Sequence, residues 1–301
     1  MPVVAMINAG SVEASAYRVT AFRMGLAETG HIEGRNLAIE YRWVEGRYDL
    51  IPEMVADLIR RRVAVIATPG STAAGLAVKA ATATIPIVFG VGTDPVKLGL
   101  VASLSRPGGN VTGVNFFTAD LGAKRLGLLR EVVPRAGRVA ALINPANAAN
   151  AEATLQSVKQ AGLAMALSID TLTASTRHEI DMAFATLVRE RVDALLVSGD
   201  GFFASRRLQL AMLAVRHSIP AIYSLRDYPE VGGLMSYGPN LFEVHRQVGN
   251  YAGQILNGTR PADLPVLQST KFEFVLNTQA AGLLGLDVPP TLLARTDVVI
   301  D

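Results

Sequence analysis

The sequence predicts an α/β protein made of two doubly wound, Rossmann-like lobes of parallel sheet, joined by a hinge of several segments. One observation is a repeat, because apolar runs at 3–8 and 139–144 both close on an asparagine followed by small residues. A second pair of runs follows in the same order, first at 62–67 and 85–88 and then at 191–197 and 219–222. Two halves of one plan predict two sheets, and the loops at the carboxyl ends of their strands are expected to line a ligand cleft between the lobes.

Buried strands and helices alternate along the whole chain. Strands are expected near 2–8, 36–43, 63–68, 86–91, 111–115, 137–144, 165–170, 193–198, 220–224 and 233–237. Helices are expected near 15–29, 49–62, 71–80, 119–132, 149–162, 176–190, 203–217 and 241–257. In the clearest helix Val19, Phe22 and Leu26 recur at helical spacing, and Gly30 follows as a stop. This alternation predicts mainly parallel sheets with right-handed crossovers.

The boundary between the lobes is not marked by a linker rich in proline, glycine or serine. The chain is expected to cross between lobes more than once, near Phe117 and again near Pro239, and several short crossings make a hinge. The helix at 241–257 has no counterpart in the first half. We expect an N-terminal lobe of 1–117 plus about 240–262 and a C-terminal lobe of 118–239 plus about 263–301.

Composition limits the class of protein. The chain has 301 residues, of which 50% are hydrophobic and 18% charged, as in a well-buried globular protein. The net charge is +2 with basic and acidic residues interleaved, so no nucleic-acid partner is expected. There is no cysteine and no run of 18 apolar residues, which excludes thiol chemistry, zinc–thiolate sites and a membrane-spanning helix.

Small and polar residues follow the expected strand ends. The candidate ligand-binding residues are Asn8, Ala9, Ser11, Gly70, Ser71, Thr72, Thr93, Asp94, Asn144, Asn147, Asp200, Phe202 and Tyr223. Hydroxyls and helix-start amides suit a carboxylate, Asp94 and Asp200 suit an ammonium, and the aromatic rings suit an apolar body. This set fits an amino acid.

Several of these residues also have a structural explanation. Ser71 and Thr72 can simply cap a helix, and Asn8 and Asn144 can close turns through their side chains. Asp94 precedes a proline, a common way for a helix to start.

Asp200 is harder to explain by structure alone, because glycines flank it directly after an apolar strand. Phe202 and Phe203 are adjacent at an expected helix start, so only one of them is expected to face the core.

The sequence lacks the motifs that mark common classes of enzyme. Gly90 and Gly92 begin a dinucleotide fingerprint, but Pro95 stands at its last glycine position, and neither a Walker loop nor a nucleophile elbow is found. None of the four histidines stands at a strand tip beside a serine or forms a zinc pair. We therefore expect no enzyme, no metal and no cofactor.

Six segments of the sequence carry a resemblance to a known family: 22–30, 33–36, 40–43, 93–96, 105–113 and 220–223. The most specific is Arg106-Pro107-Gly108-Gly109-Asn110-Val111-Thr112-Gly113. With these segments the sequence resembles the ABC-type importer substrate-binding proteins of the tryptophan- and tyrosine-binding group, which have the type I periplasmic binding protein fold. The resemblance covers essentially the whole chain.

The resemblance implies a periplasmic receptor that closes on a small solute and delivers it to a membrane permease. It places the ligand contacts in the strand-end loops named above. An aromatic amino acid is expected first, a branched-chain amino acid or an aromatic carboxylate next, and the protein is expected to be a monomer. The sequence at Met1 has no signal peptide, so the leader is expected to be missing from it.

Two alternatives remain at this stage. One is the effector domain of a transcription regulator, which would need a helix-turn-helix segment ahead of the first strand. The other is an α/β enzyme acting on a small carboxylate, since fold similarity alone does not fix function.

Overall fold

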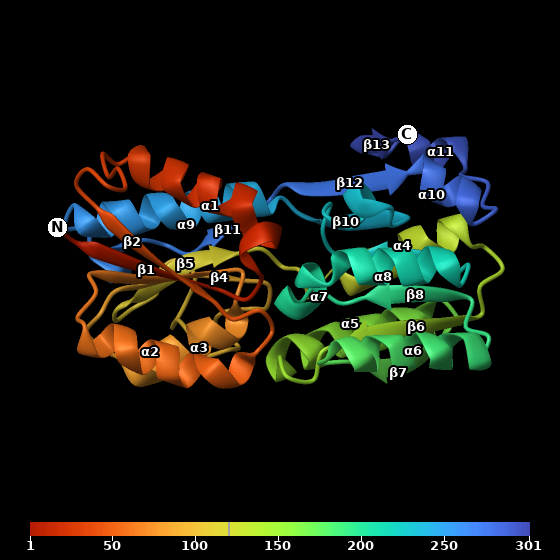
Figure 1. Cartoon of the computed structure of the whole chain (residues 1–301), viewed down its shortest axis with the longest axis horizontal. Helices are drawn as coiled ribbons and strands as arrows, with labels where there is room; N and C mark the ends of the chain where they lie inside the picture. Colours follow the sequence, from red (N-terminus) through yellow and green to blue (C-terminus); the bar gives the residue numbers. More distant parts are fainter. Residues whose placement is uncertain (120) are drawn as a thin grey trace. The chain divides into compact units, whose positions relative to one another are not determined.

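The computed structural model of the chain describes residues 1–119 and 121–301. Over these residues the chain forms two compact units. Unit 1 is Met1–Phe117 with Asn240–Thr270, and unit 2 is Thr118–Pro239 with Lys271–Asp301. The backbone therefore passes from one unit to the other three times, after Phe117, Pro239 and Thr270. The α/β class with two lobes of mainly parallel sheet is confirmed (Figure 1).

Unit 1 contains a six-stranded sheet in the order β11-β5-β4-β3-β1-β2, and all its pairs are parallel. The strands are β1 (Val3–Asn8), β2 (Ala38–Trp43), β3 (Val65–Pro69), β4 (Ile87–Val91), β5 (Val111–Asn115) and β11 (Leu267–Gln268). β1, β3 and β4 are neighbours in the middle of the sheet, so their carboxyl ends lie at one edge. β11 pairs with β5, which keeps the chain in unit 1 through Thr270.

Helices cover both faces of this sheet. They are α1 (Val12–Ala27), α2 (Ile51–Arg60), α3 (Thr72–Ala81) and α9 (Leu241–Leu256), with short 3₁₀ turns at Tyr48–Leu50 and Pro261–Asp263. α1 and α9 lie on one face and α2 and α3 on the other (Figure 1). Because both faces are covered, β3 and β4 consist entirely of buried residues.

α1 and α9 approach each other at backbone distance. A Cβ on Gly249 would lie 2.1 Å from the carbonyl oxygen of Phe22, and one on Gly25 would lie 1.9 Å from that of Arg246. Neither distance is possible for a real side chain, so glycine is required at both positions. This contact ties the second segment of unit 1 to the first.

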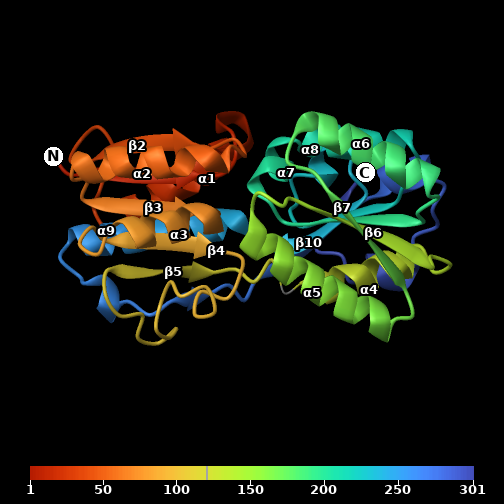
Figure 2. The ribbon, with the colours of Figure 1, turned by 90° about the horizontal axis from the view of Figure 1, so that it is seen from below.

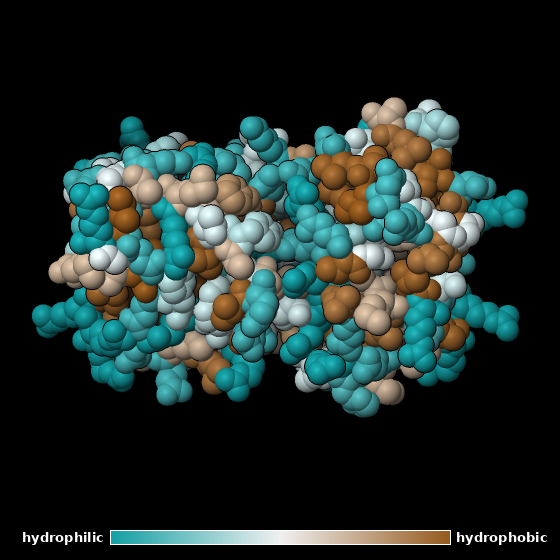
Figure 3. All heavy atoms as spheres, turned by 45° about the horizontal axis from the view of Figure 1, so that its top comes forward, coloured by the Kyte–Doolittle hydropathy of each residue, from teal (hydrophilic) through white to brown (hydrophobic). Residues whose placement is uncertain are grey.

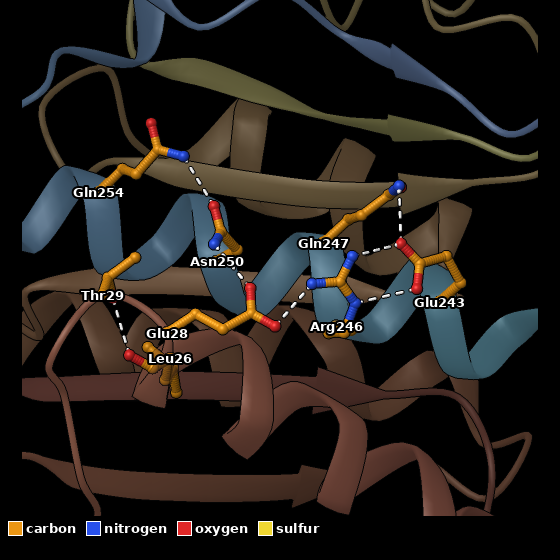
Figure 4. Close-up of polar contacts among 8 residues, drawn as sticks. All are labelled: Leu26, Glu28, Thr29, Glu243, Arg246, Gln247, Asn250 and Gln254. Atoms are coloured by element: carbon orange, nitrogen blue, oxygen red, sulfur yellow. Dashed lines mark hydrogen bonds and ion pairs between the residues drawn. The ribbon is translucent and has the colours of Figure 1, made fainter.

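A polar strip follows the outside of the same contact (Figure 4). Arg246 on α9 donates to both carboxylate oxygens of Glu243 and, across to the end of α1, to Glu28 at 2.6 Å. Asn250, one turn further along α9, donates to the other oxygen of Glu28 at 2.9 Å. Hydrogen bonds first to Glu243 and then to Glu28 raise the pKa of Arg246. The strip joins the two segments of unit 1 at the surface.

Unit 2 contains a seven-stranded sheet in the order β13-β12-β10-β9-β8-β6-β7. The strands are β6 (Arg138–Ile143), β7 (Ser168–Thr173), β8 (Ala194–Val197), β9 (Ala221–Tyr223), β10 (Met235–Pro239), β12 (Phe272–Asn277) and β13 (Val298–Ile300). All pairs are parallel except β10 with β12. The sequence did not predict β11, β12 and β13, because two of them are very short and none belongs to the repeated plan.

The helices of unit 2 are α4 (Gly122–Val132), α5 (Ala148–Ala164), α6 (Arg177–Arg189), α7 (Gly201–Ser205), α8 (Arg207–Arg216), α10 (Thr278–Leu283) and α11 (Pro290–Leu293), with a 3₁₀ turn at Pro229–Val231. α4 and α5 lie side by side on one face of the sheet, and α6 and α8 lie together on the other (Figure 2). The helix expected at 203–217 is in fact two helices, because the chain leaves helical geometry at Arg206.

Hydrophobic residues gather over the C-terminal elements on the face of unit 2 that Figure 3 shows. The exposed ones in unit 2 include Met212 on α8, Leu283 on α10 and Val299 on β13. None of them is a strand-end residue of the kind considered below. Among the described residues no helix has the length and apolar character needed to span a membrane.

Candidate functional site

The predicted site residues follow neighbouring strands in each unit. In unit 1 these are β4, β3 and β1; in unit 2 they are β8 and β6, next to β9, in which Tyr223 is the last residue. The unit 1 edge is defined here as Asn8, Ala9, Ser11, Gly70, Ser71, Thr72, Thr93 and Asp94. The unit 2 edge is defined as Asn144, Asn147, Asp200 and Phe202. Parallel neighbours end at the same side of a sheet, so each edge brings its own residues together.

Asn8 is the most connected residue of the unit 1 edge. Its Oδ1 accepts from the amide of Gly10 at 2.8 Å, which is the turn predicted from the sequence, and its Nδ2 lies 3.4 Å from Nε2 of His245. The other ring nitrogen of His245 lies 2.8 Å from the carbonyl oxygen of Leu241, so the Nδ1–H tautomer satisfies both contacts. His245 is buried on α9 beneath this edge. The sequence could not reveal the pair, because 237 positions separate the two residues.

Two serines of the unit 1 edge start helices. Ser11 Oγ accepts from the amide of Ala14 at 3.3 Å, and Ser71 Oγ accepts from the amide of Ala74 at 3.2 Å. Gly70 precedes the second cap with φ +79°, a left-handed conformation that favours glycine. The first-turn amides and the dipole of a helix favour a negative group at its N-terminus. The cap expected from the sequence at Ser71 is present, Ser11 caps α1 in the same way, and both caps place the N-termini of α1 and α3 at this edge.

Thr93 and Asp94 follow β4. Thr93 is buried, and its Oγ1 has no hydrogen-bond partner among the described residues. Asp94 is half-buried, and its Oδ1 accepts from the amides of Val96 at 2.9 Å and Lys97 at 3.3 Å. The residues after Asp94 form turns and not the helix that the structural explanation of Asp94 would need, because Gly99 in a left-handed conformation ends the segment after one turn. The Thr93 hydroxyl remains a donor for a bound group.

The unit 2 edge is organised around Asp200. Asp200 caps α7: its Oδ1 accepts from the amide of Phe202 and from Nδ2 of Asn144, both at 2.9 Å. Its Oδ2 accepts from Nδ2 of Asn147 at 2.9 Å. Asn144 also closes the predicted turn by accepting from the amide of Ala146 at 3.0 Å. These N–H donors stabilise the carboxylate and fix its orientation while it is buried from bulk water.

The expectation that only one of Phe202 and Phe203 faces the core is wrong, because both rings are buried. Their centroids lie 5.6 Å apart in a tilted arrangement. α7 has only five residues and α8 follows at once, so α7 is too short to separate a buried face from an exposed one. The guanidinium of Arg206 lies 6.0 Å from the centre of the Phe202 ring, a cation–π contact that the sequence did not reveal.

Tyr223 is placed differently from the rest. Its ring is fully buried and stacks on Tyr228 with centroids 4.4 Å apart, and its hydroxyl lies 3.5 Å from the carbonyl oxygen of Leu210 in α8. Burial raises the pKa of Tyr223. The structure therefore shows Tyr223 as part of the packing between β9 and α8, and it does not bring this side chain into the Asp200 hydrogen-bond group.

No group of three or more metal-binding side chains occurs within residues 1–119 and 121–301. The site is therefore described by hydroxyl, amide and carboxylate groups. Such groups can hold a polar organic molecule through hydrogen bonds.

The sequence profile of the ABC transporter substrate binding protein family matches residues 3–300. The chain belongs to this family. A tyrosine-binding protein of Clostridioides difficile is 26% identical over a match that covers 88% of this chain and 75% of that protein. The sequence resemblance is confirmed, and the chain is a substrate-binding protein of an ABC transporter.

Solved structures agree with the family. A conserved domain protein of Vibrio cholerae is 26% identical with a TM-score of 0.91, and each chain is covered over 99% of its length. An ABC domain of Streptococcus pneumoniae in complex with L-Trp is 24% identical with a TM-score of 0.90 and the same coverage. At this identity the second likeness shows the fold alone. The fold is that of the type I periplasmic binding proteins, as expected from the sequence.

Proposed function

We propose that this substrate-binding protein captures an aromatic amino acid in the periplasm and presents it to the permease of its importer. The observation that carries the proposal is Asp200, a buried carboxylate oriented by Asn144 and Asn147. A fixed carboxylate is a suitable partner for an α-ammonium group, because charge-assisted hydrogen bonds are the strong ones.

The unit 1 edge supplies the complementary chemistry for an α-carboxylate. It combines the N-terminus of α3, which starts at Thr72 behind Ser71, with the hydroxyl of Thr93. Charge-assisted hydrogen bonds contribute about 1.5–3 kcal/mol each, so two or three at each end of an amino acid are compatible with micromolar affinity after the costs of association.

The aromatic preference is supported by relatives. The Clostridioides difficile relative is a tyrosine-binding protein, and the Streptococcus pneumoniae structure holds L-Trp. Phe202, with Arg206 over its ring, provides an aromatic wall next to Asp200. A branched-chain amino acid and an aromatic carboxylate are the next choices.

The mechanism proposed is hinge closure. The three backbone crossings allow the units to move as two bodies, and a solute that bonds to both edges stabilises the closed form. We propose that the protein works as a monomer. The family match favours capture over the transcription-effector and enzyme alternatives, since substrate-binding proteins deliver their solute unchanged.

Isothermal titration calorimetry with L-tryptophan, L-tyrosine, L-phenylalanine and L-leucine tests the proposal, after a thermal-shift screen of the same compounds. A ligand that binds only the folded protein raises its melting temperature. We expect micromolar binding of at least one aromatic amino acid and weaker binding of L-leucine. Binding of none of the four, together with tight binding of a solute that lacks an α-ammonium group, would contradict the proposal.

A further inference from the structure

Arg125 is a charged residue sealed inside unit 2. It lies on α4 with no exposed surface. Its Nε donates to the carbonyl oxygen of Tyr237 at 2.7 Å, and its Nη1 donates to the carbonyl oxygen of Thr118 at 3.0 Å. Its Nη2 is buried without a hydrogen-bond partner, and no carboxylate of the described residues forms an ion pair with it. The guanidinium is thus held by main-chain oxygens.

The two carbonyls that Arg125 contacts belong to crossing segments. Thr118 is the first residue of unit 2 after the chain leaves unit 1, and Tyr237 lies two positions before Pro239, where the chain returns. These positions are 119 residues apart in the sequence (237 − 118), yet one side chain binds both.

The third crossing is joined to the same place. β12 begins at Phe272, directly after Lys271, and pairs with β10 so that Phe272 lies opposite Pro239. The ring of Tyr237 stacks on that of Phe272 with centroids 6.1 Å apart, and Nζ of Lys124 lies 5.9 Å over the Tyr237 ring. Neighbouring residues of α4 therefore contact the unit 2 side of the first two crossings, and Tyr237 links the third crossing to the same place.

The backbone is crowded at this point. A Cβ on Gly238 would lie 1.8 Å from the carbonyl oxygen of Ser224 and 3.7 Å from Nη2 of Arg125. The crossing strand therefore runs in contact with the end of β9, and Arg125 lies beside it. Small changes in the position of this strand are resisted by main-chain contacts on one side and by the guanidinium on the other.

Burying a guanidinium has a large free-energy cost, because the charged group loses its contact with water. Burial lowers the pKa of Arg125 to about 9, which is still above neutral, so the group is charged at pH 7. Replacing buried charged groups by apolar residues of similar volume is often neutral or stabilising. An arginine at this position is therefore better explained by the directed bonds that it makes to two separate segments than by its contribution to the core.

We propose that Arg125 is a positioning residue for solute capture. Its hydrogen bonds hold the backbone of the first and second crossings against α4. These segments then move with unit 2, and the bending that accompanies closure is confined to the bonds around 117–118 and 239–240. This inference rests on the proposed function, because it concerns the hinge closure through which the solute is captured.

The test compares Arg125→Met and Arg125→Lys with a matched control, Leu129→Ala. Leu129 is also buried on α4 but belongs to the hydrophobic cluster beneath it. Hydrogen–deuterium exchange is followed in peptides covering 115–119 and 236–241. We expect exchange in both segments of the methionine variant to be at least about tenfold faster than in the control. Without the guanidinium bonds these segments open locally more often, and amide exchange reports such opening. Equal exchange in the methionine variant and the control would overturn the proposal.

Affinity is measured on the same proteins by calorimetry with L-tryptophan and L-tyrosine. Closure is measured with L-tyrosine by the fluorescence of Trp43, the only tryptophan of the chain, excited where tyrosine does not absorb. We expect the methionine variant to bind about tenfold more weakly than wild type, and Leu129→Ala to bind within about twofold of wild type. Only Arg125→Met removes the hydrogen bonds to the crossing segments. The lysine variant keeps the charge but has one donor group, so it should lie between wild type and the methionine variant in both measurements. Should the methionine variant fail to fold, the lysine variant carries the comparison.

The two proposals fail in different ways. If wild type binds neither amino acid, the proposed ligand is wrong, while the exchange data still decide whether Arg125 fastens the crossings. If wild type binds and the arginine variants match Leu129→Ala in affinity, the proposed function stands and the role of Arg125 in capture is wrong.

Discussion

The two units carry polar residues at the ends of equivalent strands, but they hold them in different ways. At the unit 2 edge, Asn144 and Asn147 after β6 donate to Asp200 after β8, so side chains from two strands are bonded to each other. At the unit 1 edge, Ser11, Ser71 and Asp94 accept, in the bonds described above, only from amides two or three residues further along the chain.

This difference indicates that the two edges suit different charged groups of a ligand. A carboxylate fixed by several donors is ready to accept a cationic group with little reorganisation, whereas hydroxyls and helix N-termini favour an anionic group. One exception at the unit 1 edge is Asn8, which is fixed from behind by His245 on α9. The position of Asn8 at this edge therefore depends on α9.

The largest effect is expected from Asp200→Asn. The substitution keeps the shape and the helix cap but removes the charge, and losing a charged hydrogen bond to an α-ammonium group costs about 3 kcal/mol, or about 100-fold in affinity. Calorimetry with L-tryptophan measures the effect. The matched control is Asp94→Asn, for which we expect a loss of less than about fivefold. A larger loss for Asp94→Asn would reverse the assignment of the two edges.

Gly249→Ala should disturb unit 1 alone. The added Cβ would lie 2.1 Å from the carbonyl oxygen of Phe22, so α1 and α9 must separate, at a cost of about 2 kcal/mol in the free energy of unfolding. Trp43 on β2 reports the unfolding of unit 1 in denaturant. Gly282→Ala in α10 of unit 2, where no atom lies within 4 Å of the new Cβ, is the control and should not lower stability. Equal effects of the two substitutions would show that the contact is looser than described.

Thr93→Val should weaken binding without weakening the fold. The Thr93 hydroxyl has no partner within the described structure, so its removal leaves the melting temperature unchanged or slightly higher. Loss of one hydrogen bond to a carboxylate should weaken L-tryptophan binding by about 1 kcal/mol, or about fivefold. Thr68→Val removes another unpartnered buried hydroxyl, beneath α3, and should leave affinity unchanged. Similar affinities of the two variants would remove Thr93 from the site.

The smallest effect concerns pH and unit 2 stability. Hydrogen bonds from the amide and then the hydroxyl of Ser175 lower the pKa of Glu179, which forms a capping box with Thr176 at the start of α6. A carboxyl group whose pKa is lowered by folding stabilises the protein above its unfolded pKa, and this stabilisation is lost as the pH falls through the folded pKa. Glu179→Gln should therefore flatten the loss of stability in acid, as followed by circular dichroism. An unchanged acid profile would contradict this reading of the cap.

Much of the fold could be predicted from the sequence, because continuous apolar strands and capped helices leave local signals. The turn at Asn8 and the cap at Ser71 are examples in which one side chain and a nearby amide suffice. β12 and the partners of Asp200 could not be predicted in this way, since they depend on pairing between distant segments. The same holds for His245 beneath Asn8. The burial of both Phe202 and Phe203 was missed because periodicity does not apply to a helix of one turn.

The central claim is that an amino acid is recognised at both its charged ends. Calorimetry with L-tryptophan, tryptamine and indole-3-propionic acid tests it directly, because the second compound lacks the carboxylate and the third lacks the ammonium group. The account predicts micromolar binding of L-tryptophan and at least about 100-fold weaker binding of the other two, as expected when charge-assisted hydrogen bonds are lost at one end. Binding of either truncated compound as tightly as L-tryptophan would contradict it.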